Sequence, residues 1–349
     1  MEDVMNARSG LRVVVTGATG NVGISVMKAL AADESIASIL GLARRLPALS
    51  LPKAAWGVVD VSQLGSAGEL RSYFVGADVV VHLAWRFQPT HDPVVTWHNN
   101  VAGSMRVFEA VREAGVPALV YASSVAAYSP GPKTEPGVGE EWPTHGWPDA
   151  AYCREKAYVE RVLDIYELEN PDIRVVRMRP GFLFQEPAAS EQRRIFVGRF
   201  VPGPLLRPDL LPWVPDLQGL RFQVLHTDDA AQAYLVAVRD DVRGAFNLAA
   251  QPVIDANTLG TQLGARLVKV PRNLMRTALS AAWQAHAVPA SPYLFDAVLR
   301  LPTMDCGRAR DLLGWHPKRT AEEALDAFLK GVPHGSGAKT RPLARHRVG

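Results

Sequence analysis

The sequence predicts an α/β fold, in which a doubly wound parallel sheet carries a smaller, mainly helical lobe. Two observations support this prediction. Short apolar runs rich in valine alternate with helical patterns between residues 11 and 178, and such an alternation builds βαβ units with helices on both faces of a parallel sheet. After Gly181 the chain becomes rich in proline, arginine and leucine and loses any clean period. A length of 349 residues suits one large domain and one smaller domain.

The elements of the sheet domain follow from their apolar patterns. A first strand over 11–16 is followed directly by a glycine-rich turn and a helical pattern over 22–32. Further helices are expected over 96–114 and 152–168. The remaining apolar runs predict strands over 36–42, 56–59, 77–84, 117–122 and 173–178. Because ligands bind beyond the carboxyl ends of parallel strands, we expect the functional residues to gather at that edge.

The second half of the chain is expected to divide between the two lobes. Strand-like segments at 221–225 and 245–248 and a helix over 229–238 are expected to return the chain to the sheet domain. The sheet domain therefore comprises 11–182 together with 221–250. The substrate-binding lobe is expected from 183–220 and 252–332. The two ends, 1–10 and 335–349, are expected to be flexible tails.

Composition and charge exclude several classes of function. Hydrophobic residues make up 48% of the chain, charged residues make up 21%, and the formal net charge is +3. This balance gives no argument for a nucleic-acid or membrane partner, so a small-molecule substrate is expected. Cys153 and Cys306 form neither a disulfide framework nor a metal-ligand pattern, and Cys153 is expected to pack in the interior. The polar N-terminus lacks the apolar core of a signal peptide, and we expect a cytoplasmic protein.

A glycine-rich loop follows the first predicted strand. It reads TGATGNVG and contains Gly17, Gly20 and Gly23. Glycines there permit a tight turn and let the backbone approach a pyrophosphate, while the following helix N-terminus offers free N–H groups. The pattern is typical of a Rossmann-type dinucleotide-binding domain, and its position directly after a strand disfavours the alternative of a glycine turn without a ligand. The other loop residues expected to contact the dinucleotide are Thr19, Asn21 and Val22.

The end of the second predicted strand indicates which dinucleotide is bound. An acidic residue there would bind the ribose 2′-hydroxyl of NAD, but residues 41–45 read GLARR. Arg44 and Arg45 suit a 2′-phosphate, so NADP(H) is favoured over NAD(H); the alternative is a pair of solvated arginines. Asp60 could accept a hydrogen bond from the adenine amino group or cap the following helix. Further contacts are expected from Val61, Leu83 and Ala84.

The candidate catalytic residues end strands or begin helices. Tyr152 and Lys156 are four residues apart on a predicted helix and so share one face. A nearby ammonium would lower the pKa of Tyr152 and make the phenol a usable general acid and base. Ser123 and Ser124 end a strand, where a hydroxyl could bind a substrate carbonyl or cap a turn. Asn100 could hold a water that relays protons to Lys156, or cap a helix.

The histidines do not form a metal-ligand pattern. His82 lies in a predicted strand and is interpreted as a satisfied core residue. His91 and His98 lack a partnering ligand, and His226, with Asp228 close by, is interpreted as a strand end and helix cap. No metal is therefore expected. No Gly-x-Ser-x-Gly elbow surrounds the serines, which argues against a hydrolase.

A set of motifs occurs in one order between about residues 11 and 330. They are TGATGNVG, HLA at 82–84, NNVAGS at 99–104, SSVAAY at 123–128, YCREK at 152–156, RPGFLF at 179–184 and LHTDDAAQAY at 225–234. With these motifs the chain resembles the extended short-chain dehydrogenase/reductases, the group that contains NAD-dependent epimerases and dehydratases.

The resemblance implies roles for individual residues. Ser124 corresponds to the catalytic serine, Tyr152 to the acid/base and Lys156 to the lysine that binds the nicotinamide ribose. Asn100 matches the asparagine of the Asn-x-x-Gly motif. The further residues expected to contact the cofactor are Gly17, Gly20, Gly23, Ser123, Pro180 and Gly181.

Departures from the family pattern bear on the substrate. Val125 and Ala126 stand where sugar dehydratases that resemble this family carry an Asp-Glu pair, so elimination of water is not expected. Aromatic residues cluster in the motifs around the expected site, and an apolar pocket would favour a non-sugar carbonyl. The residues expected to contact the substrate are Trp85, Phe87, Ser124, Phe182 and Phe184.

Three hypotheses follow. The first is an oxidoreductase that transfers hydride between NADP(H) and a carbonyl or secondary alcohol, with Tyr152 as the acid/base. The second is a nucleotide-sugar epimerase that uses a tightly bound NAD(P). The third is a non-catalytic regulator that senses NADP, and the presence of serine, tyrosine and lysine together argues against it. Relatives often form dimers through a helix pair, so a homodimer is an expectation taken from them.

Overall fold

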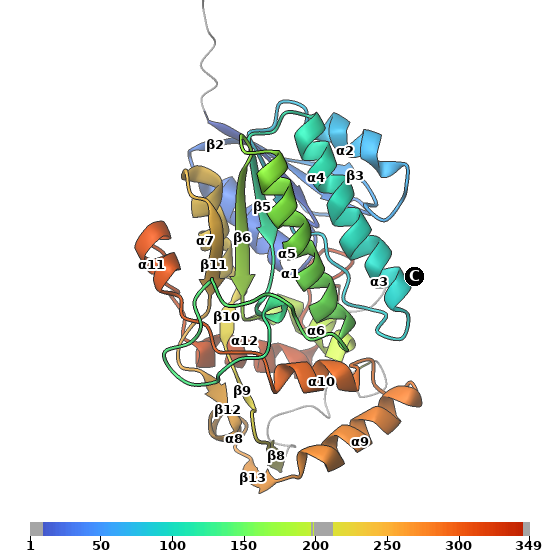
Figure 1. The fold of residues 1–349 in the computed structure, drawn as a ribbon, viewed down its shortest axis with the longest axis vertical. Helices are drawn as coiled ribbons and strands as arrows, with labels where there is room; N and C mark the ends of the chain where they lie inside the picture. Colours follow the sequence, from blue (N-terminus) through green and yellow to red (C-terminus); the bar gives the residue numbers. More distant parts are fainter. Residues whose placement is uncertain (1–9, 197, 199–211, 345–349) are drawn as a thin grey trace, which may run out of the picture.

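The computed structural model describes residues 10–196, 198 and 212–344. In this part of the chain, seven parallel strands form one sheet in the order β11-β6-β5-β4-β1-β2-β3 (Figure 1). The strand order reverses between β1 and β4, and in such sheets ligands bind in the crevice at that point. The strands are β1 (Leu11–Thr16), β2 (Ile36–Ala43), β3 (Ala54–Val58), β4 (Val79–His82), β5 (Ala118–Ala122), β6 (Arg174–Pro180) and β11 (Gly244–Leu248).

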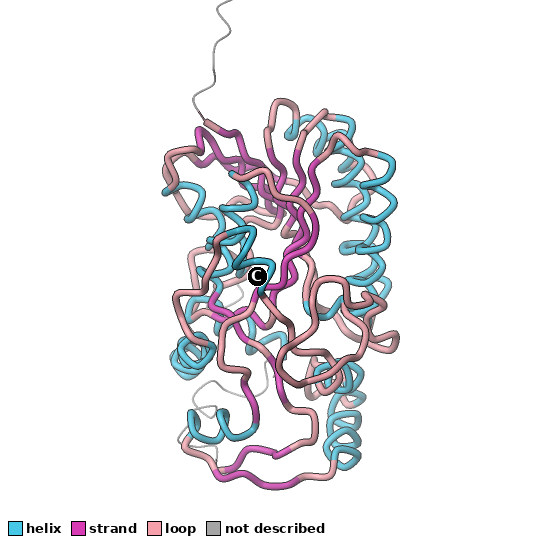
Figure 2. Tube along the Cα trace, turned by 60° about the vertical axis from the view of Figure 1, so that its left-hand side comes forward, coloured by secondary structure: helices cyan, strands magenta, loops and turns pink. Residues whose placement is uncertain are grey.

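Helices cover both faces of the sheet, as Figure 2 shows. The side chains of β1 alternate between two cores: Val13 and Val15 pack with α1 and α7, whereas Val14 packs with α2, α4 and α5. Because both faces are covered, the strands read as continuous valine runs. These helices are α1 (Asn21–Ala32), α2 (Ser66–Phe74), α4 (Gly103–Glu113), α5 (Ala151–Glu169) and α7 (Thr227–Arg239).

The helix expected over 96–114 is divided in the structure. It begins earlier, as α3 (Pro93–Trp97), continues as a π-helical turn over His98–Ala102 and then becomes α4. Asp92 caps α3 by accepting a hydrogen bond from the Val95 amide. The π-helical turn carries the fully buried Asn100, whose hydrogen bonds are described below. Single π turns inside helices often occur at functional sites.

A smaller lobe lies at the carboxyl edge of the sheet, in the lower part of Figure 1. It combines short helices with three two-stranded pairings, β7 with β10, β9 with β12 and β8 with β13, so the described part is less purely helical than expected. Its strands are β7 (Phe182–Phe184), β8 (Trp213–Asp216), β9 (Arg221–Phe222), β10 (Val224–His226), β12 (Ile254–Asp255) and β13 (Arg266–Lys269). Its helices are α6 (Ala189–Phe196), α8 (Ala256–Leu263), α9 (Arg272–Gln284) and α10 (Pro292–Val298).

One of the last two helices differs from the expected lobe boundary. Both α11 (Gly307–Leu313) and α12 (Ala321–His334) were expected in the smaller lobe. Leu313 of α11 and Leu325 of α12 instead belong to the hydrophobic core that also contains residues of α1 and α7. α11 packs against β11 and α7 of the sheet domain, whereas α12 packs against β7, β10 and α6 of the smaller lobe. Only α11 therefore differs from the expected boundary.

The C-terminal segment also differs from the expected flexible tail. Residues 336–344, here called the C-terminal strap, run back to the glycine loop. Leu343 is completely buried beside Ile24, and the Thr340 hydroxyl donates to the Thr19 carbonyl at 2.9 Å. Arg194 of α6 donates to the Pro342 carbonyl at 2.7 Å. Residues 1–9 and 345–349 of the expected tails lie outside the described residues.

No helix among the described residues is both long and apolar enough to span a bilayer.

Candidate active site

The glycine loop borders a cavity of about 130 Å³, here called the glycine-loop cavity. The cavity lies at the carboxyl ends of the four strands around the point where the strand order reverses, β1 to β4. Its walls include Thr16, Gly17, Thr19, Gly20, Arg44, Asp60, Val61, Leu83, Ala84 and Trp85 from this edge, with Glu191 of α6 and Pro342 of the C-terminal strap. About half of the residues expected to contact a dinucleotide thus line one cavity.

The three glycines of the loop meet different demands. Gly17 has a φ of +68° and lies so close to β4 that a Cβ would stand 2.6 Å from the Ala84 nitrogen. A Cβ at Gly23 would collide with the Gly17 carbonyl oxygen. At Gly20 the nearest atom would be 3.5 Å from a Cβ, an ordinary contact. The protein itself therefore does not require glycine at Gly20, which points to a ligand that approaches the backbone there.

The N-terminus of α1 is open to an anion. Its cap, Gly20, supplies no side-chain hydrogen bond, and its first turn carries no acidic residue. Free N–H groups and the helix dipole favour a phosphate at such an end. The side chain of Asn21 is used elsewhere, since its Nδ2 donates to the Leu183 carbonyl and its Oδ1 accepts from Gln185. Asn21 can therefore offer a ligand its backbone N–H, whereas its side chain ties α1 to the smaller lobe.

Arg44 and Asp60 lie on the same cavity. Arg44 is exposed, and so is its neighbour Arg45, which does not line the cavity. The Asp60 carboxylate caps a turn, because its Oδ1 accepts from the Ser62 amide at 3.0 Å and from the Ser62 hydroxyl at 2.7 Å. Of the two roles considered for Asp60, the structure shows the capping role. The second carboxylate oxygen of Asp60 has no hydrogen bond to a described residue.

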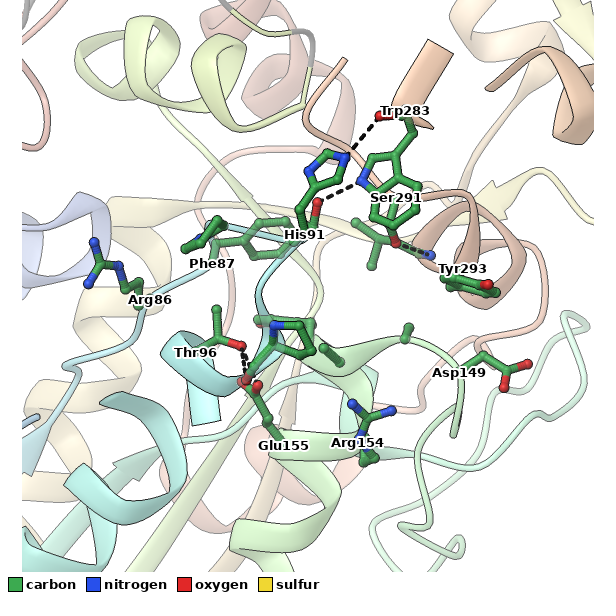
Figure 3. A pocket seen from close by; sticks show the side chains of 17 residues that line it. Arg86, Phe87, His91, Thr96, Asp149, Arg154, Glu155, Trp283, Ser291 and Tyr293 are labelled. Carbon is green, nitrogen blue, oxygen red and sulfur yellow. Dashed lines mark hydrogen bonds between the residues drawn. The ribbon is translucent and has the colours of Figure 1, made fainter. Parts of the chain in front are cut away.

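A second cavity of about 190 Å³, here called the tyrosine cavity, lies beside Tyr152 (Figure 3). It is enclosed by the loop after β4, by the start of α5 and by α9 and α10 of the smaller lobe. Phe87 lines it, as does Arg86, which also lines the glycine-loop cavity. The ring of Tyr152 lies 4.9 Å from that of Phe87 and 6.0 Å from that of Trp85. Tyr152 therefore lines the tyrosine cavity and contacts Trp85, which lines the glycine-loop cavity.

The pKa of Tyr152 differs from the sequence-based expectation. Burial raises it to about 12, and a hydrogen bond with the Ser124 side chain opposes this rise only in part. Lys156 is absent from the charges that act on the phenol. The predicted lowering of the Tyr152 pKa by Lys156 is therefore wrong for this structure, because desolvation of the phenolate dominates.

Lys156 contacts an aromatic ring and a backbone carbonyl. Its ammonium lies 3.4 Å from the centre of the Trp85 ring and donates to the Ala122 carbonyl at 2.6 Å. Burial lowers its own pKa well below the ordinary value of 10.5. The indole N–H of Trp85 is buried without a hydrogen-bond partner. Trp85, expected at the substrate, thus lies at the glycine-loop cavity beside Lys156 and offers an unused donor there.

Asn100 forms a closed hydrogen-bond network. Its Nδ2 donates to the Glu155 carboxylate at 2.6 Å and to the Arg86 carbonyl at 2.8 Å. Its Oδ1 accepts from the Arg86 amide at 2.7 Å and from Asn99 at 3.0 Å. These bonds use both hydrogens and both lone pairs of the amide. The side-chain amide of Asn100 therefore has no free donor or acceptor for a water that relays protons. Asn100 instead fixes the loop that carries Arg86.

Ser124 and Ser123 point to different partners. Ser124 caps the short helical turn over Val125–Ala127, since its Oγ accepts from the Ala126 amide at 3.1 Å, and it lies beside Tyr152. The Ser123 hydroxyl donates to the buried Glu160 carboxylate at 2.6 Å. The side chain of Ser123 is therefore part of the protein interior, in contrast to the expected cofactor contact.

The RPGFLF segment contributes less to the two cavities than expected. Pro180 ends β6, and Gly181 and Phe182 line a separate, small cavity with Val125. Phe184, expected at the substrate, is buried and stacks on Phe328 of α12 at 4.8 Å. Phe184 is a core residue because β7 lies between the sheet and α12.

The other singled-out residues have structural roles. His82 is buried between the Thr16 and Ser104 hydroxyls, and burial lowers its pKa to about 3. His226 caps α7 by accepting from the Asp228 amide. Cys153 is fully buried. No group of three or more histidine, cysteine, aspartate or glutamate side chains in the described ranges could hold a metal ion.

Sequence reasoning missed three residues of the site. Glu155 binds Asn100 and the Thr96 hydroxyl, and it lies inside the YCREK motif, three residues after Tyr152. Helical spacing could have indicated that Glu155 shares a face with Tyr152. Trp283 and Tyr293 line the tyrosine cavity, but their segment carries no motif that would have identified them.

Comparisons with known proteins agree with this arrangement. The model of the NAD-dependent epimerase/dehydratase family matches residues 13–249. A 4-hydroxy-2-methyl-3-oxo-4-farnesyl-3,4-dihydroquinoline-1-oxide ketoreductase of Stigmatella aurantiaca is 25% identical over 343 residues, covering 94% of this chain and 98% of the relative. An uncharacterized protein of Mycobacterium tuberculosis is 26% identical over 325 residues. That match covers 92% of this chain, which spans only 30% of the length of the mycobacterial relative.

A solved structure shares the fold over almost the whole chain. It is a UDP-glucose-4-epimerase from Stenotrophomonas maltophila with bound NAD and formylated UDP-arabinopyranose, with a TM-score of 0.69 and 18% identity. The alignment covers 93% of this chain and 99% of the epimerase. Together with the family match over more than half of its length, this shows that the chain belongs to the NAD-dependent epimerase/dehydratase family.

Proposed function

We propose that the chain is an oxidoreductase that transfers hydride between NADP(H) and a carbonyl or secondary alcohol, with Tyr152 as the acid/base. The observation that carries this proposal is that Tyr152 lines one cavity and contacts a residue of the other. The phenol lines the tyrosine cavity, while Trp85, which lines the glycine-loop cavity, contacts both Tyr152 and Lys156. The similarity to a ketoreductase over almost the full length of both chains supports the same reaction type.

The residues present fit a dinucleotide. The uncapped start of α1 and the open approach at Gly20 suit a pyrophosphate. Trp85, which lines the same cavity, has an indole N–H without a hydrogen-bond partner. Lys156 would hold the nicotinamide ribose, as the family resemblance implies. When bound, the nicotinamide supplies or accepts the hydride.

Arg44 supports NADP(H) over NAD(H). It lines the glycine-loop cavity at the end of β2, and its guanidinium has no hydrogen bond or ion pair to another described residue. A guanidinium can bind a phosphate with two charge-assisted hydrogen bonds. The acidic residue that would bind a free 2′-hydroxyl is absent from 41–45.

Tyr152 and Ser124 would handle the substrate oxygen. The Ser124 side chain is hydrogen-bonded to Tyr152, and Tyr152 lines the tyrosine cavity. Both hydroxyls could therefore donate a hydrogen bond to a carbonyl oxygen beside Tyr152 and stabilise the negative charge that develops on it. Tyr152 then gives its proton to the alkoxide. Because burial raises the pKa of Tyr152 to about 12, the phenol is protonated at neutral pH, which is the form that carbonyl reduction requires. The protonated phenol can therefore act as the general acid in carbonyl reduction.

The test is a comparison of the wild-type protein with Tyr152→Phe. NADPH consumption with a panel of ketones measures turnover, and quenching of tryptophan fluorescence measures NADPH binding. We expect turnover to fall by about 1,000-fold in the variant and the NADPH dissociation constant to stay unchanged. Equal turnover by both proteins would refute Tyr152 as the acid. Isomerisation of a nucleotide sugar without net NADPH consumption would replace the reductase by an epimerase.

A further inference from the structure

Aromatic side chains line the tyrosine cavity on several sides (Figure 3). Phe87 and His91 come from the loop after β4, Trp283 from α9 and Tyr293 from α10. In the view of Figure 3, Phe87 and Tyr293 lie on either side of the open space, and Trp283 and His91 lie above it. Two parts of the chain that are far apart in the sequence thus supply ring faces to one space beside the reacting phenol.

Hydrogen bonds and stacking fix the upper wall. The Trp283 indole N–H donates to the Thr90 hydroxyl at 2.9 Å, and that hydroxyl donates to the Pro289 carbonyl at 2.6 Å. The His91 ring stacks on Trp283 with centroids 4.1 Å apart and an angle of 10° between the ring planes. The polar edge of Trp283 is therefore used within the protein, and what it offers to a ligand is ring surface.

The two threonine hydroxyls of the wall are also engaged. The Thr90 hydroxyl both accepts from Trp283 and donates to a carbonyl, and the Thr96 hydroxyl donates to Glu155 at 2.5 Å. The Ser291 hydroxyl accepts from the Leu294 amide at 3.2 Å. A sugar carries several hydroxyl groups that lose their water hydrogen bonds in a closed site unless the wall replaces them. The hydroxyl hydrogens of Thr90 and Thr96 are thus occupied and do not provide such replacements, whereas Ser291 keeps its own.

The charged side chains of the wall balance in sign. Arg86 and Arg154 oppose Asp149 and Glu155 in the lining. Arg154 donates to the Pro148 carbonyl at 2.6 Å, Arg86 donates to the Gln88 carbonyl at 3.0 Å, and Glu155 accepts from Thr96 and Asn100. A diphosphate brought into this space would meet no excess of positive charge to offset its loss of hydration.

The size of the cavity sets an upper limit on the reacting part of the substrate. A cavity of about 150 Å³ lined by apolar side chains holds benzene, and the tyrosine cavity measures about 190 Å³. From the ring walls, the engaged threonine hydroxyls, the balanced charges and this volume, we infer that the substrate is an uncharged aryl ketone of one or two rings. Its carbonyl lies at Tyr152 and its ring lies against Trp283 and Tyr293. This inference rests on the proposed function and narrows it.

Matched ketones test the inference. Acetophenone and cyclohexyl methyl ketone share one carbon skeleton and differ in whether the ring is aromatic. Tetralone adds a second ring, while glyceraldehyde and UDP-glucose present hydroxyls and a diphosphate. With the full chain and NADPH, we expect kcat/KM for acetophenone to exceed that for cyclohexyl methyl ketone by about 10-fold, since each aromatic pair adds stacking energy beyond buried area. UDP-glucose has no free carbonyl to reduce, and with NADP+ in place of NADPH it should be neither oxidised nor isomerised.

Variants connect this preference to the cavity. Trp283→Leu and Tyr293→Leu should each reduce the aryl preference several-fold and leave NADPH binding unchanged. Trp283→Phe keeps a ring but loses the hydrogen bond to Thr90, so it should retain most of the preference. Trp213→Leu is the matched control, because Trp213 is half-exposed on β8 and lines neither cavity.

Two readouts separate the inference from the proposed function. Calorimetric titration of Tyr152→Phe with acetophenone and with cyclohexyl methyl ketone, in the presence of NADPH, measures binding without turnover. Equal affinity and equal kcat/KM for the two ketones would overturn the aryl preference and leave the oxidoreductase proposal intact. Aryl-selective binding combined with no NADPH consumption by the wild-type protein would uphold the ligand class and overturn the proposed reaction.

Discussion

Replacing Glu160 by glutamine should lower the unfolding free energy by about 3 kcal/mol at neutral pH. The carboxylate is fully buried between α5 and β6 and accepts hydrogen bonds from Ser123, Arg177 and Arg179. Burial alone would raise its pKa, but the hydrogen bonds and charge of Arg179, with the charge of Arg177, lower it from 4.5 to about 2. At ~1.4 kcal/mol per pKa unit, that difference corresponds to about 3 kcal/mol.

The pH dependence gives this prediction a second signature. Because the folded pKa of Glu160 lies below the unfolded one, the stabilisation is complete above about pH 5 and is lost as the pH falls towards 2. The difference between wild type and Glu160→Gln should therefore be constant near neutral pH and shrink in acid. Urea unfolding followed by circular dichroism at several pH values measures both quantities.

Glu167→Gln is the matched control. Glu167 pairs with the same Arg177 at 2.7 Å, but its side chain is 35% exposed, so its loss should cost less than about 1 kcal/mol. Breaking a buried pair costs more because it leaves a charge uncompensated. Equal destabilisation by the two substitutions, or a Glu160→Gln effect that does not change between neutral pH and pH 3, would refute the reasoning.

Three further predictions concern the site. Arg44→Ala should weaken NADPH binding by about 10-fold or more and leave NADH binding unchanged; isothermal titration with both dinucleotides decides this, and an equal loss for both would contradict the 2′-phosphate contact. The rate of ketone reduction should stay constant through neutral pH, because the pKa of Tyr152 is raised to about 12. A fall in kcat between pH 6 and 8, with NADPH binding unchanged over the same range, would contradict this. Leu343→Asp should release the C-terminal strap, because Leu343 is completely buried. Tryptic cleavage within the strap, followed by mass spectrometry, should then become about 10-fold faster. The control Leu312→Asp, at a half-exposed leucine of α11, should leave the cleavage rate unchanged.

The sheet could be predicted from the sequence because its physical causes are local. The valine runs of β1 and β4 are buried on both faces, and each lies within a residue or two of its predicted boundaries. The Gly17 turn was recognisable because its positive φ requires glycine in a fixed place after β1. The convergence of the glycine loop, Arg44 and Ala84 followed from the shared carboxyl edge of parallel strands.

The errors arose where tertiary contacts decide the outcome. Spacing alone indicated that Lys156 would act on Tyr152, but the ammonium lies on Trp85, a residue that no helical period connects to it. The side-chain amide of Asn100 is hydrogen-bonded to Glu155 and to the Arg86 backbone. These partners come from α5 and from the loop after β4, and the sequence does not show that the two segments pack together. Leu343 lies in a segment whose composition suggests disorder, yet it fills a gap beside Ile24.

The C-terminal strap has a practical consequence for handling the protein. Ala344 accepts a hydrogen bond from Arg194, and Pro342 lines the glycine-loop cavity. A version of the protein shortened before residue 336 would therefore lose one wall of that cavity and the contact of Leu343 with Ile24. Shortened versions made for binding or crystallisation should keep residues 336–344.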